Sequence, residues 1–208
     1  MSSTITIVDY GVGNVGSIQN MLKKIGARSV VASSPEEILK ATKLILPGVG
    51  AFDAGMETLV RSGLVAALNR KVLEERTPVL GLCLGMQLMT RGSQEGKLPG
   101  LGWVDADTCK FDATATPGLK VPHMGWNLVA PAKQNPILKG YSADTRFYFV
   151  HSYYVRCEDP TDVLLKCGYA GISFDAAFQH RNLVGFQFHP EKSHRFGMWL
   201  LKNFTELC

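Results

Sequence analysis

The chain has 208 residues, of which 46% are hydrophobic and 19% are charged, with 22 Lys and Arg against 18 Asp and Glu. A formal net charge of +4 without a run of five like charges argues against a disordered chain, a dedicated nucleic-acid surface and a membrane-surface protein. A chain of this length can bury a large core without a disulfide or a metal, so we expect one domain over residues 1–208.

The cysteines are odd in number and show no zinc-ligand spacing, so we expect free thiols, no metal site and no cofactor. The N-terminus enters a strand-like run without a basic leader, and no apolar stretch approaches the roughly 20 residues of a membrane span. These features predict a reducing, cytoplasmic location. The cysteines are Cys83, Cys109, Cys157, Cys167 and Cys208.

Short apolar runs alternate with helical segments through the first ninety residues. The run 4–9 predicts a buried strand, and 15–25 predicts a helix that ends before a glycine. Ser34, Pro35 and Glu37 combine an N-cap, a proline in the first turn and an acid three residues after the cap. That combination indicates the start of a second helix.

Further strands are predicted at 30–32, 43–46 and 78–82, with helical stretches near 53–73. Strands that alternate with helices imply a mostly parallel sheet with helices on both faces, which is a three-layer α/β fold. The second half instead carries aromatic, alternating segments between Gly, Pro and Asp turns. We expect these to be antiparallel or edge strands added to the same sheet, followed by an amphipathic helix; the segments are 146–154, 163–169 and 183–188, and the helix is 193–207.

The segment Gly11–Gly16 fits the GxGxxG pattern of dinucleotide-binding turns, after a predicted strand and before a predicted helix. A ribose-binding acid is expected at the end of the second strand of such a unit, but Ser33 and Ser34 stand there. A tight turn within an α/β sheet is therefore the favoured interpretation, and dinucleotide binding stays as an alternative.

A stronger pattern is the apolar strand 79–82 that runs through Gly81, Cys83 and Gly85 into a helix. It has the form of a nucleophile elbow with sulfur in place of oxygen. Glycines allow the sharp turn, and a thiol at a helix N-terminus is favoured as the nucleophilic thiolate. A buried, purely apolar Cys83 is the alternative.

A cysteine nucleophile needs a base and a group that orients the base. His189 follows an apolar strand, where α/β enzymes place their sites, and Glu191 lies two residues on, which in extended chain is the same side. Backbone N–H groups are the usual oxyanion donors, and Leu84 and the Pro47–Gly50 turn, with Val49, are positioned to supply them.

The Gly-x-Cys-x-Gly-x-Gln segment with a distant His-Pro-Glu resembles the class I, triad-type glutamine amidotransferases. Four further segments resemble a branch of that family that serves histidine biosynthesis as a glutaminase subunit, and the likeness runs from the first strand to the last helix. The segments are PGVG at 47–50, PHMGWN at 122–127, HSYY at 151–154 and HPEKS at 189–193.

The resemblance implies that Cys83 attacks the side-chain amide of glutamine, that His189 moves protons and that Glu191 orients it. It further implies a separate cyclase subunit with a (βα)8 barrel that takes the ammonia, and a partner-dependent reorientation of the backbone near Val49. By the same likeness, glutamine-binding residues are Gly50, Gln87, Glu95, Ser152 and Tyr153, and partner-facing residues are Asn14, Met124, Trp126 and Lys192.

Other functions remain open at this point. A glutaminase subunit of another amidotransferase pathway would share the whole triad, as would a freestanding γ-glutamyl or cysteine hydrolase that acts without a partner. A catalytically inactive interaction module would show no selective alkylation of Cys83. A tryptophan such as Trp126 could equally be a core residue, and Glu95 an ordinary surface acid.

Overall fold

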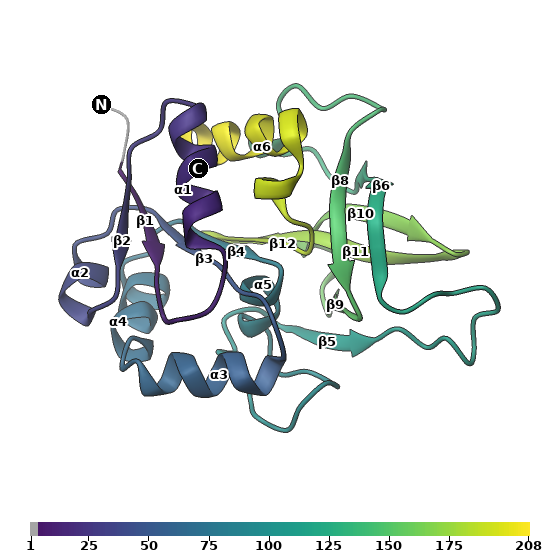
Figure 1. The fold of residues 1–208 in the computed structure, drawn as a ribbon, viewed down its shortest axis with the longest axis horizontal. Coiled ribbons are helices and arrows are strands. Elements are labelled where there is room, and N and C mark those ends of the chain that lie inside the picture. Colours follow the sequence, from purple (N-terminus) through teal and green to yellow (C-terminus); the bar gives the residue numbers. More distant parts are fainter. Residues whose placement is uncertain (1–3) are drawn as a thin grey trace.

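A computed structural model describes residues 4–208; residues 1–3, on which the expected absence of a leader partly rests, lie outside it. A large twisted sheet crosses the molecule, and its first five strands in spatial order are parallel (Figure 1). In that order they are β2 (Ser29–Ala32), β1 (Ile5–Val8), β3 (Leu44–Leu46), β4 (Val79–Leu82) and β12 (Leu183–Phe186).

Antiparallel strands extend the sheet beyond β12. They continue in the order β11 (Ile172–His180), β10 (Val163–Tyr169) and β7 (Ala130–Pro131). Near β11 the sheet also takes in β9 (Tyr153–Cys157), which pairs in turn with β5 (Ala106–Lys110).

Helices cover both faces of the parallel part, as Figure 1 shows, so the predicted three-layer α/β fold is confirmed. One face carries α1 (Val15–Lys24) and α6 (His194–Leu207). The other carries α2 (Pro35–Leu39), α3 (Phe52–Arg61), α4 (Val65–Asn69), which continues as a π-helical turn over Arg70–Glu74, and α5 (Leu84–Leu88).

Alternation along the strands creates the two cores between the layers. Ile5 and Ile7 of β1 pack under α1 and α6, whereas Val8 packs under the helices of the opposite face. On β3, Ile45 packs on the side of α1 and α6, and Leu46 packs on the opposite side. These side chains are completely buried, and full burial of each such side chain contributes about 1.5–3 kcal/mol, so both helical layers are held firmly against the sheet.

The predicted start of α2 is confirmed in detail. The Ser34 hydroxyl accepts a hydrogen bond from the Glu37 N–H at 3.4 Å, and the Glu37 carboxylate accepts from the Ser33 N–H at 2.8 Å and the Ser34 N–H at 3.2 Å. This reciprocal capping satisfies N–H groups that a helix start leaves without partners.

Two predictions for the second half need correction. The segment 146–154 is two strands, because β8 (Arg146–His151) pairs only with β6 (His123–Leu128) in a separate two-stranded sheet, whereas β9 joins the main one. The segment at 183–188 is antiparallel to β11, as predicted, but it is not an edge strand: β12 lies inside the sheet and is parallel to its other neighbour, β4. Both errors concern which distant strand pairs with which, and side-chain alternation carries no information on that choice.

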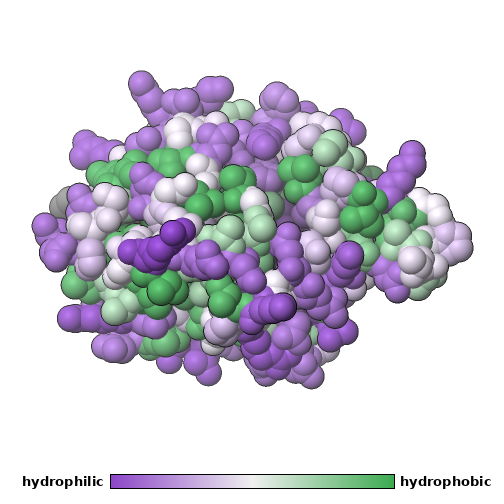
Figure 2. Space-filling view, turned by 60° about the horizontal axis from the view of Figure 1, so that its bottom comes forward, coloured by the Kyte–Doolittle hydropathy of each residue, from purple (hydrophilic) through white to green (hydrophobic). Residues whose placement is uncertain are grey.

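The surface mixes hydrophobic and hydrophilic residues, as Figure 2 shows for one face. A mainly apolar hollow lies between α3, α4 and the segment 98–101, with Met56, Val60 and Leu101 in its wall. Within residues 4–208, no helix combines the length and the hydropathy required to cross a bilayer.

Candidate active site

The chain turns sharply at Cys83, between β4 and α5. Its backbone angles are φ 51° and ψ −109°, a conformation that side-chain-bearing residues rarely adopt and that is typical of functional sites. The flanking glycines permit the turn, since a Cβ on Gly81 would lie 2.8 Å from the Gly85 oxygen, and one on Gly85 would lie 2.0 Å from the Leu46 oxygen. The predicted nucleophile elbow is therefore present.

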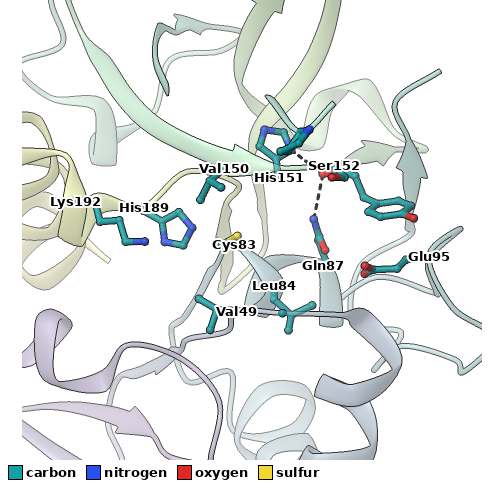
Figure 3. A pocket seen from close by; sticks show the side chains of 13 residues that line it. Val49, Cys83, Leu84, Gln87, Glu95, Val150, His151, Ser152, His189 and Lys192 are labelled. Atoms are coloured by element: carbon teal, nitrogen blue, oxygen red, sulfur yellow. Dashed lines mark hydrogen bonds between the residues drawn. The ribbon is translucent and has the colours of Figure 1, made fainter. Parts of the chain in front are cut away.

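Cys83 lines a cavity of about 430 Å³, although the residue as a whole is only 8% exposed. Its sulfur lies at the centre of the pocket, with Val49 and Leu84 on one side and Val150 opposite (Figure 3). The other pocket residues that the sequence predicted are Gly50, Gln87, Glu95, Ser152, Tyr153, His189 and Lys192.

His189 and Glu191 form a buried pair beside the sulfur. The Nδ1 atom of His189 lies 2.7 Å from the Glu191 Oε1 atom, and both side chains are 3% exposed. Burial lowers the pKa of His189, but the interactions with Cys83 and Glu191 outweigh it and raise the pKa to about 9. His189 therefore carries a proton at neutral pH, next to the Cys83 sulfur.

The Nε2 atom of His189 is buried, and among residues 4–208 no atom forms a hydrogen bond of standard geometry with it. Figure 3 shows the imidazole on the side of the pocket that faces Cys83. The His189 N–H donates to the Tyr148 carbonyl at 3.0 Å, and the Ser193 hydroxyl donates to the His189 carbonyl at 2.6 Å. These contacts hold the backbone of His189, and Glu191 holds its ring at Nδ1, so that Nε2 is free for proton transfer.

The turn at 47–50 packs closely on the elbow. A Cβ on Gly48 would lie 2.7 Å from the Gly85 nitrogen, so only glycine permits this approach. The same turn is held by Tyr10, whose hydroxyl donates to the Pro47 carbonyl at 2.8 Å. Burial and then the negative charge of Cys83 raise the pKa of Tyr10 well above its usual value, so this hydroxyl keeps its proton.

Oxygen acceptors gather at the end of the pocket away from His189. Figure 3 shows Gln87 and Glu95 there, with His189 and Lys192 at the opposite end. A carboxylate oxygen of Glu95 accepts from the Phe52 N–H at 2.8 Å, which ties it to the start of α3. The pocket therefore has an end with oxygen acceptors, which suits an ammonium group, and a cationic end, with the sulfur between them.

The predicted partner-facing residues do not form one group. Met124 and Trp126 lie on β6 with 61% and 44% exposure, and Lys192 lines the pocket. Asn14 is absent from the pocket lining and caps α1, where its side-chain oxygen accepts from the Ser17 N–H at 3.3 Å.

The sequence interpretation missed Gln187, His151 and Leu128. Gln187 is completely buried, and its Nε2 lies 3.8 Å from the Cys83 sulfur. The signal was its position two residues before His189 at the end of a strand, which in extended chain is the same side. Leu128 is 52% exposed and continues the outward-facing alternation of Met124 and Trp126.

The cysteines other than Cys83 lie outside the pocket, and all five are free thiols. Burial raises the pKa of Cys157 and of Cys167 to about 12 in each case, so both remain protonated. Across residues 4–208, no group of three or more His, Cys, Asp and Glu side chains has the arrangement of a metal site.

The glycine-rich turn Gly11–Gly16 packs against Pro47, since a Cβ on Gly13 would lie 2.9 Å from that proline.

Comparisons with known proteins agree with this geometry. The family model described as glutamine amidotransferase class-I matches residues 6–207. The chain is 56% identical over 203 residues to imidazole glycerol phosphate synthase subunit HisH 2 of Pseudomonas aeruginosa, with 98% of this chain and 99% of that protein covered. It is 52% identical over 202 residues to subunit HisH 2 of Methanococcus maripaludis, with 97% and 98% covered.

Solved structures share the fold at lower sequence identity. The chain superposes on PurLQS from Thermotoga maritima with a TM-score of 0.75 at 15% identity, with 98% of each chain covered. A glutamine amidotransferase from Thermotoga maritima gives a TM-score of 0.65 at 14% identity, with 97% of this chain and 82% of that chain covered. At these identities the likeness concerns the fold alone.

Proposed function

The chain belongs to the class-I glutamine amidotransferase family, and from that premise we propose that Cys83, His189 and Glu191 carry out its glutamine hydrolysis. It is a glutamine amidotransferase of the kind that acts as the glutaminase subunit of imidazole glycerol phosphate synthase in histidine biosynthesis. The observation that carries the assignment of residues is the strained Cys83 elbow beside the 2.7 Å His189–Glu191 pair, within one pocket.

The first half of the reaction forms a covalent intermediate. The Cys83 thiolate attacks the side-chain amide carbon of glutamine, and backbone N–H groups of Leu84 and the Val49 turn stabilise the resulting oxyanion. The protonated His189 then donates its proton to the amide nitrogen, the C–N bond breaks, and ammonia leaves. The γ-glutamyl group remains on the sulfur as a thioester.

The second half regenerates the thiolate. Neutral His189 takes a proton from a water molecule, which attacks the thioester carbon, and the C–S bond breaks to release glutamate. Glu191 keeps the Nδ1 proton of His189 in place, so that Nε2 is the nitrogen that moves protons in both halves. Glu95 and Gln87 bind the α-ammonium end of glutamine, since they place acceptor groups opposite Lys192.

The ammonia is passed to a separate cyclase subunit built on a (βα)8 barrel. Ammonia that escapes to neutral water is protonated and loses its nucleophilicity, so a closed passage to an acceptor site is needed. The exposed apolar side chains Met124 and Trp126 lie on β6, which directly follows the pocket residue Pro122, and they support a partner on this face.

We also propose that partner binding reorients the backbone near Val49. A single domain over residues 1–208 is supported by the family match over 6–207.

A glutaminase assay of the purified chain, alone and with its cyclase partner, tests the proposal. We expect Cys83→Ala to fold normally and to lose glutamine hydrolysis by at least about 10³-fold. Cys109→Ala, which changes a buried thiol outside the pocket, is the matched control and should keep wild-type rates. Hydrolysis by the Cys83→Ala protein at the wild-type rate would refute the triad.

A further inference from the structure

A continuous set of hydrogen bonds runs from β6 to the Cys83 sulfur, and its fixed point is the backbone carbonyl of Tyr153. That oxygen lies 2.7 Å from His151 Nδ1 and 3.2 Å from Gln87 Nε2 (Figure 3). A carbonyl only accepts hydrogen bonds, so both side-chain nitrogens must donate. One backbone atom therefore sets the tautomer of His151 and the orientation of the Gln87 amide.

On the β6 side, each direction follows from the one before. With its proton on Nδ1, neutral His151 has an acceptor at Nε2, which lies 3.0 Å from His123 Nδ1. His123 therefore donates from Nδ1 and accepts at Nε2, where Asn127 Nδ2 lies at 3.4 Å. Asn127 also donates to the Gly168 carbonyl at 2.9 Å, a second acceptor that fixes its amide.

The protonation states agree with this pattern. Burial lowers the pKa of His123 to about 4 and that of His151 to about 3. Both rings are therefore neutral at neutral pH, each with one donor and one acceptor. A proton on either ring would place two N–H groups against each other or against Asn127.

On the other side of Tyr153, the directions of the hydrogen bonds are fixed in the same way as far as the Cys83 sulfur. Gln87 Nε2 donates its second hydrogen to the Gln187 Oε1 atom at 3.0 Å, which leaves the Gln87 oxygen directed into the pocket. Gln187 must then present its Nε2 to the Cys83 sulfur, 3.8 Å away, and the side chain is completely buried. A flipped Gln187 would oppose two N–H groups, so its donor is locked on the sulfur.

We propose that Gln187 is a positioning residue for the glutaminase reaction, locked by Gln87, Tyr153 and the His123–His151 pair so that its N–H stabilises the thiolate of Cys83. The inference rests on the proposed role of Cys83 as nucleophile. The thiolate also faces the His189 imidazolium, the protonated Tyr10 hydroxyl and, across the pocket, Lys192. Gln187 adds a neutral donor whose direction does not depend on pH.

Gln187→Glu keeps the acceptor oxygen of this side chain and removes its N–H donor. A carboxylate still accepts from Gln87 but has no N–H for the sulfur, and it places a negative oxygen there. We expect the midpoint of the pH dependence of Cys83 alkylation by iodoacetamide to rise by about one pH unit or more, and kcat to fall by about tenfold or more. The KM for glutamine should change by less than about threefold, because the Gln87 contact is kept.

Gln134→Glu is the charge-matched control, because Gln134 is exposed and does not line the pocket, and it should behave as wild type. Gln187→Met, which keeps the length of the side chain without polar atoms, should raise the alkylation midpoint in the same direction. If Gln187→Glu fails to fold, as judged by its thermal unfolding, Gln187→Met decides the question. An unchanged midpoint in the folded variants would overturn the proposal.

The His151 end gives an independent readout. His151→Leu removes the donor that holds the Tyr153 carbonyl in place, so this carbonyl can move away from Gln87 and the KM for glutamine should rise by about tenfold. His151→Asn carries an amide donor near the position of Nδ1 and should recover most of that loss. Equal KM values for the two variants would contradict the directed set of bonds. Cys83→Ala distinguishes the failures: if it is inactive while Gln187→Glu is normal, only the Gln187 proposal is wrong.

Discussion

The orientation of His189 depends on a single carboxylate. Glu191 contacts His189 Nδ1 at 2.7 Å, and its charge is among the interactions that raise the pKa of His189 to about 9. Since the proposed mechanism requires the protonated imidazole to donate to the leaving amide nitrogen, glutaminase activity should fall as the pH rises through about 9. The position of this alkaline limb depends on the interactions of His189 with Cys83 and with Glu191 together.

Replacement of Glu191 by Gln should move that limb. Loss of the negative charge lowers the pKa of His189, so the alkaline decline of kcat should begin at lower pH than in the wild type. The rate should also fall by about 10²–10⁴-fold, as expected when a triad carboxylate becomes an amide. Steady-state glutaminase kinetics between about pH 6 and pH 10 provide the test, and an unshifted alkaline limb would show that Glu191 does not control the proton on His189.

His151 links pH to stability. The folded chain holds it neutral with a pKa of about 3, whereas in the unfolded chain its pKa is about 6.5. The contribution of neutral His151 to the free energy of unfolding is therefore complete above about pH 6.5 and is lost as the pH falls toward 3. Between about pH 7.5 and pH 5, wild type should lose about 2 kcal/mol more of its free energy of unfolding than His151→Asn, which cannot titrate. Urea denaturation at both pH values measures the difference, and parallel losses in the two proteins would count against a neutral buried His151.

At the scale of elements, α3 and the segment that carries Glu95 hold each other. The Glu95 carboxylate accepts from the Phe52 N–H, and the Asp53 carboxylate accepts from the N–H groups of Lys97 at 2.9 Å and Leu98 at 3.1 Å. A Cβ on Gly96 would lie 1.9 Å from the Asp53 Oδ1 atom, so a larger residue there would displace the Asp53 carboxylate from its hydrogen bonds. The start of α3 thus positions one wall of the pocket.

Two substitutions test this contact and should not be additive. Asp53→Ala and Gly96→Ala each displace the Glu95 segment, so each should raise the KM for glutamine several-fold while kcat changes less. In the Asp53→Ala background, Gly96→Ala should cost little more, because the clashing carboxylate is gone. Asp112→Ala is the control, because Asp112 accepts from Thr114 and Ala115 within its own loop and has no contact with the pocket. Additive effects of the two substitutions would exclude direct contact as the cause.

The sequence was sufficient for features that depend on neighbouring residues. The Ser34–Glu37 cap and the glycine-flanked Cys83 elbow are local patterns with one physical solution. The His189–Glu191 pair was predicted from extended chain, but a 3-10 turn over Pro190–Lys192 is what brings the Glu191 carboxylate to His189. The hydrogen bonds around Gln187 could not be predicted in this way, because they join four distant segments. The separation of β8 from the main sheet was missed for the same reason.

For the whole molecule, β6 presents three exposed apolar side chains on one face. Met124, Trp126 and Leu128 are 61%, 44% and 52% exposed, and Trp126 stacks on His194 with ring planes 4° apart. An ordered, exposed tryptophan among apolar neighbours is typical of the centre of a protein–protein interface. The location of the chain in the cytoplasm, by contrast, stays a prediction.

Removal of Trp126 should weaken binding of the cyclase. Trp126→Ala should cost about 1–3 kcal/mol of association free energy, a dissociation constant raised by about 10–100-fold, measured by titration calorimetry with the purified partner. Val60→Ala shortens another exposed apolar side chain, 60% exposed on α3, and should leave the affinity unchanged. Equal affinities of wild type and Trp126→Ala would place the partner on a different face.

The order of strands also has a consequence for protein synthesis. β4, which ends at the nucleophile, lies between β3 and β12, so one of its two neighbours comes from residues 183–186. A ribosome has delivered most of the polypeptide before that strand, and the imidazole that follows it, can leave the exit tunnel. Until then β4 is an open edge and the thiol has no base. A nascent chain in which residues 183–189 have not yet left the tunnel therefore lacks both a neighbour of β4 and the imidazole that the proposed glutamine hydrolysis requires.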